Sequence, residues 1–291
     1  MKKYVKLMRV HHYMKNLLLL LPLFFSGRMS DGRLFFQGLL AFVAFSLMAS
    51  AIYIFNDMMD VERDRSHSTK KNRPLASGAV SLQNAGVLAG VLLFLSLGCH
   101  FLCGILRPVP TWSVLYLLLY LGLNVAYSWG LKAVPLMDIA ILASGYLIRV
   151  LYGAALSGIA VSSWLYLTVT AAAFYLGFGK RRGELLREGQ TREVLAYYSV
   201  DYLDKSMYMC LGLVLVFYSL WCADPMVLPS VRAGGNPLVW TVPLVLLICL
   251  KYNLNLEKTS DGDPVEVVLH DKWLLLLVLA FGLVTIGAVY L

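Results

Sequence analysis

The chain of 291 residues is 59% hydrophobic and only 14% charged, and its mean hydropathy is +0.70. This composition excludes an ordinary soluble globule, because a chain of this length could not keep so much apolar surface away from water. The formal net charge of +8 would suit a nucleic-acid partner, but the positions of the basic residues must be known before that charge is interpreted.

Nine apolar segments follow one another along the chain. They lie at 16–26, 34–55, 79–106, 112–129, 135–157, 162–179, 206–222, 237–252 and 273–291. Most are long enough to cross a hydrocarbon core about 30 Å thick, whereas the first is short and is expected to begin in the interface. No linker or soluble segment interrupts them. The sequence therefore predicts an all-α, polytopic membrane protein of about nine transmembrane helices, folded as a single domain over residues 1–291.

The basic residues are distributed unequally between the two sides of this arrangement. With a cytoplasmic N-terminus, 20 of the 25 Lys and Arg residues lie on the cytoplasmic side, four lie on the opposite side, and Arg149 lies within a span. Such an excess in cytoplasmic loops is the usual signature of membrane orientation. We therefore expect a multi-pass protein of the cell (inner) membrane, and the basic charge requires no nucleic acid.

The main polar cluster follows the second span, where residues 56–78 read NDMMDVERDRSHSTKKNRPLASG. Its first four ligand-type residues recur at steps of one, three and four, which places the carboxylates on one stripe of a helix: Asn56, Asp57, Asp60 and Asp64. Stacked carboxylates repel one another unless a cation lies among them, and Mg²⁺ accepts such oxygens together with a substrate's phosphates. The basic run that ends at Arg73 supplies donors for that anion. The alternative is a solvated, charged loop between two membrane helices.

A second polar cluster lies at the end of the sixth span. It contains three adjacent cations and one acid, namely Lys180, Arg181, Arg182 and Glu184. Glu184 is four residues after Lys180, and an ion pair between them would turn the basic group towards a polar cavity. Phosphate is the ligand that such a group suits. The alternative is that these cations only set the membrane topology.

The fifth span carries charges at its start and near its middle. Lys132 is the only cation in the loop that follows Tyr127, and Asp138 lies about one helical turn further on, just inside the span. The pair is expected either to contribute to a site or to form a structural ion pair. Arg149 lies near the middle of the span, where a charge is expected to face the bundle interior or a wet cavity.

The residues from Asn56 to Asp64 resemble the N-D-x-x-D-x-x-x-D signature of the UbiA-type membrane prenyltransferases. More specifically, the chain resembles the branch that contains decaprenyl-phosphate phosphoribosyltransferases, through blocks that run from residue 9 to about 272. These blocks are Lys15-Asn16, Asp64-Arg65-x-His67, the run from Asn72 to Gly78, Leu131-Lys132 through Pro135 to Asp138, the run from Ala143 to Arg149, Gly179-Lys180-Arg181-Arg182-x-Glu184, and the run from Asp263 to Val267. The resemblance implies a UbiA-like helical bundle.

That branch transfers the 5-phosphoribosyl group of phosphoribosyl pyrophosphate to a polyprenyl phosphate and releases pyrophosphate. The resemblance thus implies a Mg²⁺-dependent transferase of cell envelope biosynthesis, whose partners are those two substrates and membrane lipids; a homo-oligomer stays open. The expected metal ligands are Asn56, Asp57, Asp60 and Asp64, and the expected catalytic residues are Asp57, Asp60, Asp64 and Lys132. The expected substrate-binding residues are Lys15, Asn16, Arg73, Tyr127, Asp138, Arg149, Lys180, Arg181, Arg182 and Glu184.

Two other functions compete with this interpretation. Ordinary members of the family move a prenyl group from its diphosphate to an aromatic acceptor, and they typically carry a second aspartate-rich motif after the sixth span. The cations at 180–182 replace those acids here, which favours a phosphate monoester and hence the phosphoribosyl transfer. A transporter with Asp138 and Arg149 on its permeation route is the third hypothesis. The acidic cluster argues against it, because that cluster is expected at the cytoplasmic mouth and not at the midplane.

Overall fold

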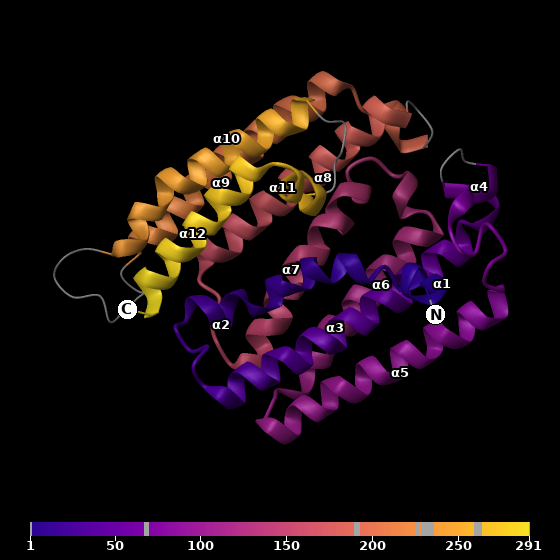
Figure 1. Ribbon diagram of the computed structural model, residues 1–291, viewed down its shortest axis with the longest axis horizontal. Coiled ribbons are helices and arrows are strands. Elements are labelled where there is room, and N and C mark those ends of the chain that lie inside the picture. Colours follow the sequence, from indigo (N-terminus) through magenta and orange to yellow (C-terminus); the bar gives the residue numbers. More distant parts are fainter. Residues whose placement is uncertain are drawn as a thin grey trace. The chain divides into compact units, whose positions relative to one another are not determined.

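The computed structural model describes residues 2–66, 70–188, 193–224, 227, 236–258 and 264–290 (Figure 1). Within these ranges the regular structure is helical and includes no strand, which confirms the all-α prediction. The α-helices are α1 (Lys2–Met8), α2 (Leu21–Phe25), α3 (Gly32–Met59), α4 (Val61–Ser66), α5 (Leu82–Leu106), α6 (Val114–Trp129), α7 (Met137–Ser157), α8 (Ser163–Glu188), α9 (Val200–Ala223), α10 (Val242–Lys258), α11 (Pro264–His270) and α12 (Lys272–Tyr290). The 3₁₀ helices are η1 (Val10–Leu20), η2 (Lys70–Asn72), η3 (Thr111–Ser113), η4 (Leu131–Ala133), η5 (Glu193–Tyr197) and η6 (Pro237–Thr241).

Seven helical stretches in the described ranges are long and apolar enough to cross a membrane. They are Gly32–Met59, Leu82–Leu106, Thr111–Trp129, Met137–Ser157, Val200–Ala223, Pro237–Glu257 and Lys272–Tyr290. Each corresponds to one of the nine predicted spans. The first predicted span is instead η1 followed by the five-residue α2, and the sixth is α8, which has 26 residues but is not among the seven. The count of nine is therefore not confirmed.

The chain forms two compact units. Unit 1 comprises Met1–Phe24, Arg28–Leu131 and Ile148–Ala160, and unit 2 comprises Phe25–Gly27, Lys132–Leu147 and Val161–Leu291, so that the division falls within α7. The prediction of a single domain over residues 1–291 stays a prediction.

Unit 1 is built around α3. This helix packs most extensively against α5 and also contacts α1, η1 and α6, and Figure 1 shows α3 and α5 running side by side. The most apolar stretch of α3 is 56% buried inside the protein, whereas that of α5 is 22% buried, so α3 is the inner helix of the pair. Asp31 caps α3 at its start by accepting hydrogen bonds from the backbone N–H groups of Arg33 and Leu34.

A glycine allows α7 to approach η1 within unit 1. A Cβ atom added at Gly153 would lie 1.8 Å from the backbone oxygen of Leu19. Only a residue without a side chain fits at this distance. The close contact places the second half of α7 against the 3₁₀ segment, one helical turn from Arg149.

Unit 2 is organised around α8 and α9, which pack extensively against each other, and α10 contacts both α9 and α12. Asp271 begins α12 by accepting hydrogen bonds from the backbone N–H groups of Trp273 and Leu274, and it forms an ion pair of 2.7 Å with Lys251 of α10. The hydrogen bond from Lys251 is the main reason that the pKa of Asp271 falls to about 2. The carboxylate therefore stays charged while it joins the two helices.

Candidate active site

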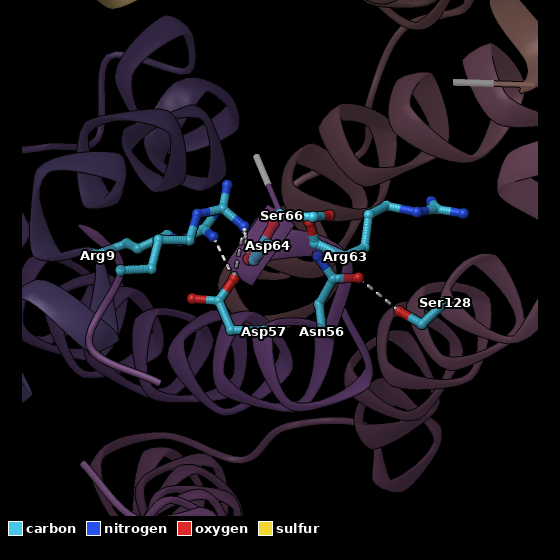
Figure 2. A network of polar contacts seen from close by, with 8 residues as sticks. Arg9, Asn56, Asp57, Arg63, Asp64, Ser66 and Ser128 are labelled. Atoms are coloured by element: carbon cyan, nitrogen blue, oxygen red, sulfur yellow. Dashed lines mark hydrogen bonds and ion pairs between the residues drawn. The ribbon is translucent and has the colours of Figure 1, made fainter. Parts of the chain in front are cut away.

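Two buried carboxylates and two arginines converge in unit 1. The Nη2 atom of Arg9 lies 2.5 Å from Oδ1 of Asp57, and the Nη1 atom of Arg73 lies 3.2 Å from the same oxygen. The same Nη1 atom lies 2.6 Å from Oδ2 of Asp64. Figure 2 shows the Arg9 and Asp57 side chains facing each other, with Asp64 close by. The cluster thus joins four residues from three parts of the sequence.

Local backbone structure places each member of this cluster. Asp57 lies in the last turn of α3, and α4 continues nearly without a break, because the Asp60 N–H bonds to the Asn56 oxygen and the Asp64 N–H to the Asp60 oxygen. The two carboxylates are thereby carried about two helical turns apart, on the same side of the chain. Arg9 lies between α1 and η1 in a left-handed conformation, with φ 53° and ψ 49°. This conformation is uncommon for a residue other than glycine.

The other two predicted metal ligands are Asn56 and Asp60. The side-chain oxygen of Asn56 accepts a hydrogen bond of 3.0 Å from the Ser128 hydroxyl of α6, which Figure 2 also shows. Asp60 ends α3 and is half-buried. A carbonyl oxygen has a second lone pair, so Asn56 keeps an acceptor position for a further ligand.

The donor set fits magnesium. One nitrogen atom of Arg73 contacts an oxygen of both Asp57 and Asp64, so the two carboxylates already point at one positive charge. Carboxylate and amide oxygens are the ligands that Mg²⁺ prefers, and such sites usually take only one or two carboxylates, with water and substrate phosphates completing the shell. Among the described residues, however, no three His, Cys, Asp or Glu side chains lie close enough to hold a metal ion, so Asp57, Asp60 and Asp64 do not form an assembled metal site in this structure.

Arg149 faces the interior of unit 1, as expected, and is 5% exposed. Its Nε donates to the side-chain oxygen of Asn16 at 2.7 Å, and its Nη2 donates to the Tyr120 hydroxyl at 3.1 Å. The guanidinium also stacks over the rings of Phe45 and Tyr120. Asn16 in turn donates to Ser46 of α3 at 2.9 Å. The network therefore joins α7, η1, α6 and α3 at the segment that also carries Lys15.

Unit 2 contains a separate buried network centred on Asp138 and Arg181, both of which are 0% exposed. Arg181 donates from Nε to Asp138 at 2.5 Å and from Nη1 to Glu184 at 2.6 Å. Arg182 donates to Asp204 at 2.5 Å and to the backbone oxygen of Leu256. Carboxylates thus neutralise two of the three cations that the sequence assigns to a phosphate.

Tyr198 connects this network to the loop before α7. Its hydroxyl donates to Asp138 at 2.7 Å and accepts from the backbone N–H of Leu136 at 2.6 Å, and Leu136 has a φ of 65°. Burial raises the pKa of the Tyr198 hydroxyl, and the Asp138 charge adds to the rise, so that the group keeps its proton and remains a donor. Tyr198 thereby supports the loop that contains Lys132.

The remaining predicted residues are half-buried. They are Lys15 in unit 1 near the Arg149 network, Tyr127 in the last turn of α6, Lys132 in η4, and Lys180 on α8. The structure brings Asp57, Asp64 and Arg73 together, and separately Asp138, Arg181 and Glu184. The roles of all of them in binding or catalysis stay predictions.

Sequence reasoning missed several residues that the structure places in these networks, among them Arg9, Ser128 and Tyr198. Arg9 is one of five cations before the first apolar segment, and that group was attributed to membrane topology. Its position just before an uncharged segment is the only signal that could have singled it out. Ser128 and Tyr198 carry no such signal, because an isolated hydroxyl near the end of an apolar segment, or in a connection between two segments, is common.

Comparison with known proteins shows the family. Residues 18–276 match the sequence profile of the UbiA prenyltransferase family. The chain is 33% identical over 293 residues to the decaprenyl-phosphate phosphoribosyltransferase of Corynebacterium glutamicum, covering 99% of this chain and 86% of that protein. It is 33% identical over 292 residues to the protein of the same name from Mycobacterium tuberculosis, covering 98% of this chain and 93% of that protein.

The fold is also similar to that of a solved UbiA homolog. The solved structure of a UbiA homolog from Archaeoglobus fulgidus bound to GPP and Mg²⁺ superposes with a TM-score of 0.70 at 17% identity, over 99% of both chains. At this identity the similarity concerns the fold alone. With seven helices in its described ranges that are long and apolar enough to cross a membrane, the chain is a multi-pass membrane protein, and it belongs to the UbiA prenyltransferase family.

Proposed function

We propose that the protein is a membrane transferase that moves the 5-phosphoribosyl group from phosphoribosyl pyrophosphate to a polyprenyl phosphate and releases pyrophosphate, with Mg²⁺ as its metal. The convergence of Asp57, Asp64 and Arg73 carries this proposal, because it offers oxygen ligands for a divalent cation and a guanidinium for a phosphate at one place. The relatives that share a third of their residues with nearly the whole chain are named decaprenyl-phosphate phosphoribosyltransferases, and they supply the substrate class.

The polar residues around the acidic cluster of unit 1 divide metal binding and pyrophosphate binding between them in this reaction. Asp57 and Asp64, with Asn56 and Asp60, hold the metal, which when bound stabilises negative charge on the leaving pyrophosphate. Arg73 and Lys15 donate to pyrophosphate oxygens. An oxygen of the polyprenyl phosphate forms a bond to C1 of the ribose while the bond from C1 to the pyrophosphate oxygen breaks, and pyrophosphate leaves with the electron pair. Because the acceptor is already an anion, the protein needs no strong general base.

For unit 2 the proposal concerns only which side chains contact a phosphate. Lys180 and Lys132 are the proposed phosphate contacts there, because both are half-buried cations within the blocks that resemble the phosphoribosyltransferases. The ion pairs of Arg181 and Arg182 give these two arginines a structural role. Glu184 and Asp138 then act by holding Arg181, and not by touching substrate.

The proposed location is the cell (inner) membrane, with the N-terminus and the acidic cluster on the cytoplasmic side. The distribution of Lys and Arg supports this orientation. The soluble, highly charged donor would then reach the cluster from the compartment in which nucleotide precursors are made.

A transfer assay tests the proposed reaction. Membranes that contain the protein are supplied with labelled phosphoribosyl pyrophosphate and polyprenyl phosphate, and label is measured in the lipid phase. We expect Mg²⁺-dependent labelling that a chelator abolishes, and a loss of about 10²-fold or more in Asp57→Asn and Asp60→Asn, the size expected when a key electrostatic group is removed. Glu62→Gln is the matched control, because Glu62 lies in the same motif but is exposed and pairs only with Arg65 among the contacts seen.

Two outcomes would contradict the assignment. Near-normal turnover of both aspartate variants with magnesium as the only metal would remove the acidic cluster from the mechanism. Prenylation of an aromatic acid from a polyprenyl diphosphate, without any lipid-bound ribose phosphate, would decide for a conventional prenyltransferase.

A further inference from the structure

The acidic cluster of unit 1 already holds its own counter-cations. Asp57 and Asp64 carry two negative charges, and Arg9 and Arg73 balance them with two positive charges at hydrogen-bonding distance. The carboxylate side chains are only 4% and 5% exposed, whereas those of Arg9 and Arg73 are 19% and 29% exposed. Solvent therefore reaches the arginines before it reaches the carboxylates.

This charge balance opposes the binding of either ligand alone. A divalent cation that arrived by itself would place two more positive charges beside two guanidinium groups, whose charges Asp57 and Asp64 already balance. A phosphate that arrived by itself would meet arginines whose charge the carboxylates already neutralise. A cation and an anionic phosphate that arrive together allow an exchange, in which the carboxylates bind the metal and the guanidinium groups bind the phosphate.

Arg9 is the member of the cluster that is suited to move. It lies at the joint between α1 and η1 in a left-handed backbone conformation, which is strained for a residue other than glycine and persists only where surrounding contacts hold it. Its guanidinium already stacks 5.2 Å from the ring centre of Tyr53, one helical turn before Asp57. A cation–π contact with that ring stabilises the guanidinium when it leaves the carboxylate. Arg73, by contrast, joins Asp57 to Asp64 and holds the two carboxylates together.

We propose that Arg9 is an exchangeable counter-cation, which occupies Asp57 in the ligand-free protein and transfers to a phosphate of the anionic ligand when a divalent cation takes its place on the carboxylate. Metal and phosphate then bind as a cooperative pair, and each raises the affinity for the other. This inference rests on the metal and phosphate site proposed above, but it concerns binding and does not depend on which group is transferred.

Binding of Mn²⁺ to the purified full-length protein tests this exchange, because Mn²⁺ accepts the same oxygen ligands and gives a paramagnetic resonance signal when free. Titrations are made with and without inorganic pyrophosphate. For the natural protein we expect pyrophosphate to tighten Mn²⁺ binding by about tenfold or more, a normal size for coupling between two ligands. In Arg9→Gln we expect Mn²⁺ alone to bind more tightly than in the natural protein, and the enhancement by pyrophosphate to fall below about threefold.

Two further variants separate this exchange from a general loss of charge or of fold. Arg28→Gln removes one positive charge at the far end of α3, where Arg28 pairs loosely with Asp31, and should leave both titrations unchanged. Arg9→Lys keeps the charge and should keep most of the coupling. Coupling that persists at full strength in Arg9→Gln would overturn the role of Arg9, as would weaker binding of Mn²⁺ alone. Absence of any Mn²⁺ binding by the natural protein would overturn the metal site itself and the proposed function with it.

Discussion

Arg181 is the largest fully buried side chain in the described part of the chain, and its ion pairs with Asp138 and Glu184 decide its contribution to stability. Replacement by glutamine leaves two carboxylates without their cation, one of them completely buried. Breaking a buried ion pair on one side costs about 3–5 kcal/mol. We therefore expect Arg181→Gln to lower the free energy of unfolding by that amount, measured by denaturant titration of the purified protein in detergent.

Two comparisons make this prediction specific. Lys205→Gln removes a cation from an exposed ion pair with Asp201, in which the side chains are 76% and 74% exposed, and should change stability by less than about 1 kcal/mol. Adding Asp138→Asn to Arg181→Gln should recover part of the loss, because it removes the buried charge that was left unpaired. If the double variant were no more stable than Arg181→Gln, desolvation of Asp138 would not be the cause.

At the scale of single residues, the sequence predicted which charged side chains gather in the interior better than it predicted which side chains they pair with. The acids of the 56–64 segment and Arg73 were recognised, and the structure brings Asp57, Asp64 and Arg73 together. The sequence predicts a phosphate contact for Arg181, and the structure pairs it with Asp138, which lies 43 positions earlier; the phosphate contact stays a prediction. Spacing reveals only neighbours on one helix, whereas a partner on another helix depends on how the two helices pack.

At the scale of the element, Gly153 sets the distance between α7 and η1. An alanine Cβ at this position would lie 1.8 Å from the Leu19 oxygen, and a backbone atom cannot turn aside as a side chain can. We expect Gly153→Ala to force the two segments apart and to lower the free energy of unfolding. The loss should exceed the roughly 1–3 kcal/mol that is typical of overpacking, because the clash is with the backbone. Denaturant titration and the yield of monodisperse protein measure this effect.

Gly90→Ala in α5 is the matched control. A Cβ atom at Gly90 would meet nothing within 4 Å, and alanine is the better helix former by about 1 kcal/mol. This variant should therefore be neutral or slightly more stable than the natural protein. Equal stability of the Gly153 and Gly90 variants would mean that α7 and η1 do not approach as closely as the structure shows.

Hydropathy predicted most of the long helices, because seven of the nine predicted segments coincide with helices that can span a membrane. It could not predict that the first segment begins as a 3₁₀ helix, since both helix types present the same apolar composition. The close contact at Gly153 and the hydrogen bond from Arg149 to Asn16 fix that segment, and both come from a helix more than 130 positions later. The structure also extends α8 to Glu188, past Gly179, where its charged side chains find partners on other segments.

At the scale of the whole molecule, α8 decides how many times the chain crosses the membrane. Its 26 residues are about 39 Å long. The uncharged part, from Ser163 to Gly179, is about 26 Å long and only slightly shorter than a hydrocarbon core of about 30 Å. The ion pairs of Arg181 and Arg182 neutralise the charges that follow, which allows this end of the helix to reach into the interface. We therefore expect α8 to cross the membrane.

Cysteine labelling at the two ends of α8 tests this crossing and the orientation together. Ala160→Cys lies before the helix and Ala196→Cys after it, and both positions are exposed. With a cytoplasmic N-terminus and nine spans, a membrane-impermeant maleimide added to intact cells should label Ala160→Cys and not Ala196→Cys, and inside-out vesicles should give the reverse. The parent protein supplies the background from its five native cysteines, which are buried or half-buried. Labelling of both positions from one side would mean that α8 does not cross, and an exchange of the two patterns would place the acidic cluster outside the cytoplasm and away from a soluble donor made there.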